Sequence, residues 1–494
     1  MSSSKGAWKF GSSLSRRGLL VGAAGLGAGT LLGCGSEADG SQSQSLTGRK
    51  RVAVLGGGAG GLSAAYFLGD DCDVDIFESR SKLGGHCDSR SVDYAGQSIT
   101  VDLGAQFFSP GTHPIYVTLL EELGLYDPDH PDRDETLEAT GSICLFPVTG
   151  GYPFGSGWPR FCSTYPLLTP FRAIDFAVYS QVARDAILGN ISWEMRLDDW
   201  IASLPVSNDF KNNLLFPWIS ALIGTTHESA AGSSARSILQ TFALSFPSNI
   251  FESAKTFNSK IGLGGNLDRL VSRSTLSSVK LGSPVQQLAY DSGQWLVTTP
   301  GGTSGPYDAI VMNVPPHTSK DLLSPFPWAA DTRGLLSRYE FFDARLVVHT
   351  DPVYLHRDLA FRTVYNGGID GAECEGSVWL GGIHPKLPNG RTVDIYKSWA
   401  MRRRKESTSI LHQRNFRHPR ITPDSIRAAR SLASVQGQNG LYFSGQHTLG
   451  FDLQEAALYS AIKVADAIAP SSPKLASLRA RLQARGRTGI SYDL

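Results

Sequence analysis

A strand–turn–helix–strand pattern between residues 51 and 78 constrains the fold of this chain more than any other stretch. An apolar run ends at Gly56, Gly58 and Gly61, which occupy the positions of a G-x-G-x-x-G turn, and a helix-favouring segment follows. A second apolar run ends on Glu78, about 20 residues after the first glycine. The pattern therefore predicts a Rossmann-type α/β domain that binds a dinucleotide.

Each of these residues has its own physical task in such a turn. Gly56 permits the tight turn, Gly58 lets backbone approach a pyrophosphate, and Gly61 lets the helix pack closely on the sheet. The free N–H groups at the helix N-terminus attract the phosphates. Glu78 is predicted to accept hydrogen bonds from ribose hydroxyl groups.

Composition and charge narrow the class of protein. The chain has 494 residues, 41% of them apolar and 18% charged, so it can bury the cores of two or more domains. Its net charge of +1 gives no reason to expect nucleic acid as a partner. The six cysteines include no CxxC pair, so we expect no metal site, and the five after Cys34 are interpreted as ordinary thiols.

The N-terminus is interpreted as a targeting segment. Ser15 to Leu20 resembles a twin-arginine export signal, and Leu31 to Cys34 resembles a bacterial lipobox. The apolar run between them is shorter than the roughly 20 residues that a membrane span needs. We therefore expect residues 1–34 to be an export signal and 35–49 a flexible linker. The mature protein would be periplasmic or at the cell surface, anchored through a lipidated Cys34; the alternative is an uncleaved N-terminal helix.

The residues after Glu78 carry a family resemblance. A basic residue, Arg80 or Lys82, precedes the Gly84-Gly85 pair, and this arrangement resembles the flavin-containing amine oxidoreductase superfamily. Its members include amine oxidases, protoporphyrinogen oxidases, phytoene-type desaturases and fatty-acid double-bond isomerases. The glycine pair would let backbone approach the phosphates, which Arg80 or Lys82 would neutralise. Family members often have arginine where His86 stands.

Further segments extend the resemblance over about residues 50 to 470. Ile99 to Gln106 resembles the strand that approaches the isoalloxazine ring, and Ile261 to Leu270 the return to the flavin domain. Val279 to Leu288 is expected to be a strand in which Val285 supports the adenine. Leu441 to Gln446 and the following helix resemble the C-terminal flavin motif. The cofactor implied is FAD, and the nearest likeness is to bacterial NAD/FAD-binding proteins.

The resemblance implies a set of cofactor-binding residues. They are Gly56, Gly58, Ala59, Gly60, Gly61, Glu78, Arg80, Lys82, Gly84, Gly85, His86, Gly104, Ala105, Gln106, Val285, Gly445, Gln446, Leu453, Gln454 and Ala456.

The same segments predict the domain organisation. The FAD-binding domain is expected at 50–106, 260–320 and 435–470, with a mixed α+β substrate-binding or cap domain at 107–259 and 321–434. The basic tail at 471–494 is interpreted as a solvated terminus, with a membrane-surface helix as the alternative.

The chemistry is expected beside the flavin. Candidate pocket residues are Gln106, His227, Arg345, Trp379, Gln446 and His447, of which Arg345, Gln446 and His447 are predicted to be catalytic. Arg345 takes the place of a lysine that many amine oxidases hold beside flavin N5, and Leu453 that of a tyrosine. Both departures argue against a simple amine oxidase, and the apolar Leu453 favours an apolar substrate over an amine.

The leading prediction is an FAD-dependent oxidoreductase that transfers hydride from a substrate C–H bond to flavin N5, the substrate being small and apolar or lipid-like. One alternative is an amine or amino-acid oxidase that uses oxygen and releases hydrogen peroxide. Another is a redox-neutral double-bond isomerase or a non-catalytic flavin-binding lipoprotein. The electron acceptor stays open.

Overall fold

A parallel sheet of five strands carries the glycine-rich turn. The computed structural model describes residues 48–130, 133–148, 155, 157–165, 170–249, 252–488 and 492–494, so the export segment, Cys34 and most of the linker lie outside it. The strand order is β19 (Leu441–Phe443), β13 (Ala309–Met312), β1 (Lys50–Leu55), β2 (Cys72–Phe77) and β9 (Ser278–Lys280). Three separate stretches of sequence thus build one sheet, and the predicted α/β fold is confirmed.

Alternation along β1 places a different layer on each face of this sheet. Val52 and Val54 belong to a core shared with α1 (Ala59–Leu68), α9 (Gly262–Ser272) and α13 (Gln454–Ile468). Ala53 and Leu55 pack on the opposite face. That face is covered by β10 (Gln287–Asp291), β11 (Gln294–Thr299), β12 (Gly302–Tyr307), α10 (Pro316–Leu322) and α11 (Ala330–Leu336). Residues 52–55 of the strand are all apolar because both faces of the sheet are buried there.

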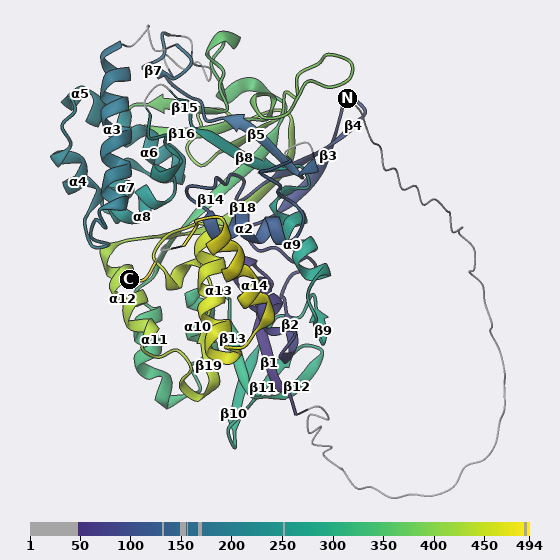
Figure 1. Cartoon of the computed structure of the whole chain (residues 1–494). Helices are drawn as coiled ribbons and strands as arrows, with labels where there is room; N and C mark the ends of the chain where they lie inside the picture. Colours follow the sequence, from purple (N-terminus) through teal and green to yellow (C-terminus); the bar gives the residue numbers. More distant parts are fainter. Residues whose placement is uncertain are drawn as a thin grey trace, which may run out of the picture. The chain divides into compact units, whose positions relative to one another are not determined.

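A second, mixed sheet of seven strands lies beside a group of helices (Figure 1). Its order is β18 (Ile410–Arg420), β14 (Glu340–His349), β17 (Tyr396–Trp399), β16 (Glu373–Trp379), β15 (Tyr365–Asp370), β6 (Ile143–Pro147) and β7 (Phe161–Cys162). The helices are α3 (Pro170–Leu188), α4 (Leu197–Ser203), α5 (Asn208–Phe210), α6 (Phe216–Ile223), α7 (His227–Ala231) and α8 (Ala235–Gln240). Sheet and helices share one hydrophobic core.

Two small antiparallel pairs complete the framework. They are β3 (Ser89–Tyr94) with β4 (Gln97–Asp102), and β5 (Thr136–Thr140) with β8 (Lys255–Ser259).

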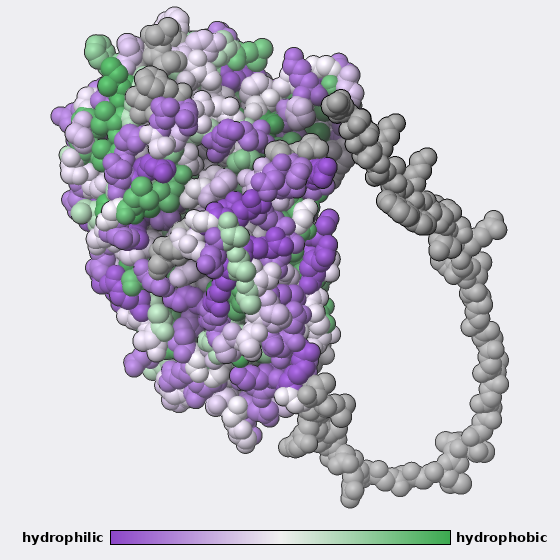
Figure 2. Space-filling view, in the orientation of Figure 1, coloured by the Kyte–Doolittle hydropathy of each residue, from purple (hydrophilic) through white to green (hydrophobic). Residues whose placement is uncertain are grey.

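In Figure 2 apolar side chains gather on the surface over α3, where Phe171 and Ile174 are exposed. Within the described residues, no helix is long and apolar enough to cross a bilayer, and no three His, Cys, Asp or Glu side chains are grouped to hold a metal ion.

Two local predictions are wrong. The strand expected over 279–288 is divided into β9 and β10, because the chain turns at Gly282, which has a φ of +59°. The basic tail is not a solvated terminus either. It forms α14 (Pro473–Ala484), which contacts α2 (Pro114–Glu122), and Arg485 and Arg487 after it bind Glu121.

Candidate active site and cofactor cavity

A cavity of about 1270 Å³ is lined by residues of both large sheets. One end begins at the turn between β1 and α1, and the other reaches α3, α6 and α8. Single small-molecule sites usually measure roughly 300–1,000 Å³. The cavity therefore has room for a dinucleotide and a substrate together.

Two glycine-rich stretches meet at the first end of the cavity. Gly58 and Gly84 form an isolated β-bridge, and the N–H of Gly84 donates to the carbonyl of Gly57 at 2.8 Å. Gly85 has a φ of +60°, and a Cβ there would stand 3.1 Å from the Cα of Gly58. Gly56, Ala59 and Gly60 complete this wall. Side chains are thus absent where a pyrophosphate would approach the N-terminus of α1.

Charged groups surround the glycine crossing. The carboxylate of Glu78 accepts from the N–H of Gly57 at 2.7 Å and that of Arg80 at 2.9 Å. Arg80 and Arg414 both line the cavity and both pair with the buried carboxylate of Asp88. Two guanidinium groups are therefore fixed where phosphates would lie, and Glu78 is fixed where a ribose would follow. Val285 lines this same cavity.

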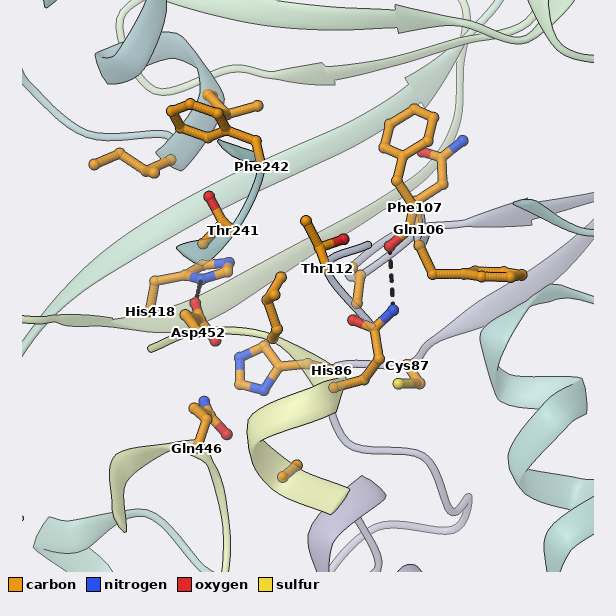
Figure 3. A pocket seen from close by; sticks show the side chains of 18 of the residues that line it. His86, Cys87, Gln106, Phe107, Thr112, Thr241, Phe242, His418, Gln446 and Asp452 are labelled. Atoms are coloured by element: carbon orange, nitrogen blue, oxygen red, sulfur yellow. Dashed lines mark hydrogen bonds and ion pairs between the residues drawn. The ribbon is translucent and has the colours of Figure 1, made fainter. Parts of the chain in front are cut away.

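The middle of the cavity is formed by residues 104–106 and by the start of α13. Gly104 packs against the carbonyl of His86 so closely that any Cβ would collide with it. The side chain of Gln106 is buried, and its Oε1 has no hydrogen-bond partner among the described residues. The amide of Gln454 donates to the carbonyl of Phe107 at 3.1 Å (Figure 3). Backbone and one unsatisfied amide therefore face the space that a flavin ring would fill.

These features fit FAD. The bare backbone at the glycine crossing suits a pyrophosphate, and Glu78 suits a ribose. The strand end from Gly104 to Gln106 and the helix start at Leu453 and Gln454 suit the ring. The first turn of a helix has N–H groups that no helical carbonyl accepts, and Gln106 adds a buried oxygen without a partner among the described residues.

Three predicted cofactor residues do not line the cavity. Gly61 packs against the carbonyl of Gly56 and brings α1 close to the turn. Lys82 turns away, and its Nζ donates to the carbonyl of Ser89 at 2.7 Å. Ala456 is buried on α13, and Ala457 lines the cavity in its place.

The placement of Arg345 is also corrected. Its guanidinium binds Glu406 at 2.7 Å and Gln413 at 3.0 Å, outside the cavity. Successive side chains of a strand point to opposite faces, and on β14 the neighbouring Leu346 faces the cavity. His227 and Trp379 do not line the cavity either; they pack on Phe216 and bind Asp394, respectively.

Gln446 and His447 do line the cavity, directly after Gly445. Figure 3 shows Gln446 near His86 and Asp452. Burial lowers the pKa of His447 to about 4, so its imidazole is neutral at pH 7. Both residues can therefore donate or accept hydrogen bonds, but His447 carries no charge there.

Lys397 is a buried amine of the cavity lining that sequence reasoning missed. It lies on β17, beside β14, and its Nζ donates to the carbonyl of Gly104 at 2.8 Å. Burial lowers the pKa of Lys397 to about 8, although the charge of Asp102 partly opposes this. Tyr396–Trp399 is a strand in the structure, but nothing in its own sequence shows which of its side chains faces the cavity.

A His418–Asp452 pair forms a second feature that the sequence did not reveal. The Nδ1 of His418 lies 3.1 Å from a carboxylate oxygen of Asp452 (Figure 3). The ring of His418 stacks on Phe342 and lies 5.3 Å from that of His86. Asp452 lies deep in the protein, but its side chain is still 36% exposed. Because it lines the cavity, this exposed part faces the cavity.

The electrostatic surroundings keep Asp452 ionised. Burial opposes ionisation, but the hydrogen bond and positive charge of His418 outweigh it, and the pKa of Asp452 falls below its usual range. Burial, aided by the charge of His418, lowers the pKa of His86 to about 4. At neutral pH the cavity thus contains a carboxylate that can accept a proton, beside a neutral imidazole.

The far end of the cavity is an apolar chamber. It is lined mainly by aromatic and aliphatic side chains, among them Phe176, Trp218, Phe242, Phe246, Val378 and Trp399. Hydroxyl groups such as those of Ser180, Ser237 and Thr241 supply its polar atoms. Within the described residues, the carboxylates of the whole lining are Glu78, Glu252 and Asp452. Glu252 is exposed at the surface, so none of these carboxylates stands among the apolar side chains of the chamber.

Comparisons with known proteins agree with this architecture. The family model described as flavin containing amine oxidoreductase matches residues 59–339. Coproporphyrinogen III oxidase of Staphylococcus aureus is 32% identical over 111 residues, which are 22% of each chain. Flavin-containing amine oxidase A of Sus scrofa is 31% identical over 131 residues, 25% of this chain and 21% of that one. The chain matches only about a fifth of the length of these curated relatives.

Solved structures share the fold over most of the chain. A CLA-producing fatty acid isomerase from P. acnes superposes with a TM-score of 0.61 at 13% identity, covering 84% of this chain and 98% of that chain. A putrescine oxidase bound to putrescine gives a TM-score of 0.56 at 14% identity, covering 85% and 99%. At these identities the likeness concerns the fold alone.

Proposed function

The chain belongs to the flavin-containing amine oxidoreductase family, as an FAD-dependent oxidoreductase, and we propose that its substrate is an apolar, lipid-like molecule rather than an amine. FAD, when bound, supplies a hydride acceptor at N5 of its isoalloxazine ring. The observation that carries the proposal is the apolar chamber beyond the ring site, whose aromatic walls favour an uncharged hydrocarbon segment.

The charges of the lining support this choice. An ammonium group entering an apolar chamber needs a carboxylate that is free to pair with it. Glu78 is bonded at the glycine end, and Glu252 lies at the surface. The remaining carboxylate, Asp452, already has His418 as its partner.

We assign the proton of the oxidation to Asp452. Removing two hydrogens from a substrate takes one hydride, which the cofactor accepts, and one proton, which needs a base. Asp452 is ionised, faces the cavity and is oriented by His418, so it can take that proton. Lys397 acts as a positioning residue, because its bond to Gly104 fixes the strand end beside the ring site.

A second candidate is an amine oxidase that reduces oxygen to hydrogen peroxide. Asp452 favours it, because an ammonium group that displaced His418 would meet an ionised carboxylate in the cavity. A redox-neutral double-bond isomerase would use the same chamber and the same base. A flavin-binding lipoprotein without activity is the remaining alternative.

Anaerobic bleaching of the flavin absorbance separates these candidates. Purified yellow holoenzyme is mixed with unsaturated fatty acids and polyenes in one series, and with putrescine and benzylamine in another. We expect bleaching with the first series and none with the amines. Bleaching by amines, followed by peroxide release in air, would establish the second candidate. Product analysis showing a shifted double bond with oxidised flavin identifies an isomerase, and no turnover of any donor contradicts the proposed oxidation.

We also propose export and lipid anchoring, from the sequence of residues 1–34 alone. Changing Arg16 and Arg17 to lysine should leave the protein in the cytoplasm. Changing Cys34 to alanine should release exported protein from the membrane fraction. Export of the double lysine variant by the normal route, or membrane retention of the alanine variant, would contradict the respective step.

A further inference from the structure

Two cysteines face each other across a pair of strands behind the cavity wall. Cys144 on β6 is the register partner of Cys162 on β7, in an antiparallel pair at the edge of the seven-stranded sheet. Both side chains are buried, and they form a small cluster with Phe146. Both are among the five cysteines interpreted from the sequence as ordinary thiols, because no CxxC pair occurs.

The hydrogen bonds around the pair define its geometry. The N–H of Ser163 donates to the carbonyl of Ile143 at 2.9 Å, so residues 143 and 163 form a hydrogen-bonded pair. The next pair along, Cys144 and Cys162, is therefore of the non-hydrogen-bonded kind, in which Cα atoms lie about 4.5 Å apart. Disulfides join Cα atoms roughly 4.4–6.8 Å apart, so no movement of the backbone is needed.

The two thiols also interact in the reduced structure. A hydrogen bond with the thiol of Cys144 is the main cause that lowers the pKa of Cys162 to about 7. The Sγ of Cys162 also lies 3.2 Å from the hydroxyl of Thr164. The sulfur atoms are thus neighbours, and one of them forms a thiolate readily.

We propose that Cys144 and Cys162 form a cross-strand disulfide that fastens β7 to the seven-stranded sheet. The alternation of β-strands explains its place. Ile143, Phe161 and Ser163 line the cavity, whereas the two cysteines point to the other face of the same strands. The bond therefore braces the wall of the substrate chamber from behind and is not in contact with the cavity.

The oxidant is a disulfide of a thiol–disulfide oxidase or of glutathione. One cysteine thiolate attacks that disulfide and releases one thiol, and the second cysteine then displaces the other. The protein loses two protons and two electrons, and the oxidant becomes two thiols. The proposed export would bring the chain to a compartment where such bonds persist.

Peptide mapping tests the bond without relying on export. The full-length holoenzyme is produced in cells with an oxidising cytoplasm. It is then unfolded in denaturant, its free thiols are alkylated, and it is digested with trypsin without reduction. Arg160 separates the two cysteines, so the disulfide links two distinct peptides. We expect that linked pair, with Cys72, Cys87 and Cys374 alkylated. Alkylation of both Cys144 and Cys162 would overturn the proposal.

Thermal unfolding supplies a second readout. Reduction should lower the Tm of the oxidised holoenzyme by about 3–8 °C, because the cross-link restricts the unfolded chain. The double variant Cys144→Ala with Cys162→Ala should not respond to reductant. The matched control Cys374→Ala, another buried cysteine, should respond as the parent protein does. Equal responses of the parent and the double variant contradict the proposal.

Discussion

Among single residues, Asp452 is the one whose chemistry follows most directly from its surroundings. It combines an open face toward the cavity with a hydrogen bond from His418. Changing Asp452 to asparagine keeps the shape but removes the base. We expect the rate of anaerobic flavin reduction to fall by about 100-fold or more, with FAD still bound. Stopped-flow absorbance with a donor that bleaches the parent protein measures this.

The control for that prediction is Asp343, an exposed carboxylate on β14 outside the cavity. Its change to asparagine should leave the reduction rate within about twofold, as expected for a surface substitution. If Asp452→Asn reduces flavin as fast as the control variant, the proton is taken by another group.

Lys397 gives a prediction that depends on pH. Its folded-state pKa of about 8 lies below the value near 10.4 of a free lysine, because burial disfavours the ammonium. The stability that this shift contributes is present above pH 10.4 and is lost as pH falls through 8. Lys397→Met should therefore become more stable, relative to the parent, as pH falls from about 10 to 7.5. Melting temperatures over that range measure the difference.

A surface lysine serves as the comparison for this experiment. Lys463 lies on α13 and pairs with Asp493 at the surface. Lys463→Met should show no such widening between pH 10 and 7.5. A constant difference between Lys397→Met and the parent would mean that the Lys397 ammonium is not disfavoured by the fold.

At the scale of elements, the crossing of the two glycine stretches is the feature most exposed to a single added carbon. Gly85→Ala would place a Cβ 3.1 Å from Gly58, at a backbone φ of +60°. Gly371 has nearly the same φ, +63°, but nothing lies within 4 Å of its Cβ position. Both variants carry similar backbone strain, about 1 kcal/mol. We expect only Gly85→Ala to weaken FAD affinity, by at least about tenfold, in a titration of apoprotein.

The crossing of the two glycine-rich stretches also shows why this part of the site could be predicted. The strand, the turn and the helix are neighbours in sequence, and their geometry requires glycine at set positions. Lys397 could not be predicted in this way. Alternate side chains of a strand point to opposite faces, and which face meets the cavity depends on segments distant in sequence. Arg345 on β14 points away from the cavity, whereas Lys397 on the neighbouring β17 points into it.

Pairs made by distant segments escaped prediction for a related reason. His418 lies near the end of β18, and Asp452 lies 34 residues later, just before α13. Each is unremarkable in its own stretch of sequence, and their meeting depends on how the mixed sheet packs over the parallel one. The apolar chamber has the same origin, because its walls come from helices α3, α6 and α8 and from the mixed sheet.

At the scale of the whole molecule, a buried carboxylate joins three parts of the chain. Glu455, on the first turn of α13, accepts from the N–H groups of Ile115 and Tyr116 at the start of α2, at 2.9 and 2.8 Å. The hydroxyl of Tyr492 donates to it at 3.1 Å. The carbonyl of Asp493 accepts from Trp193, which precedes α4. The last residues thus connect α2 and α13, beside the five-stranded sheet, to the segment that precedes α4.

This junction should make stability depend on pH. Burial raises the pKa of Glu455 to about 7, although its hydrogen bonds oppose the shift. A raised folded-state pKa contributes stability below the unfolded value near 4.3, which is lost as pH rises through 7. Tyr492→Phe removes one donor to the carboxylate, so its pKa rises further. The Tm of that variant should fall more steeply than that of the parent between pH 5 and 8, by a few degrees.

Tyr459→Phe, whose ring contacts Tyr492, is the control and should follow the parent. Parallel curves for Tyr492→Phe and the parent would mean that Glu455 does not sense its neighbour, because a loss of packing alone would lower Tm equally at both pH values.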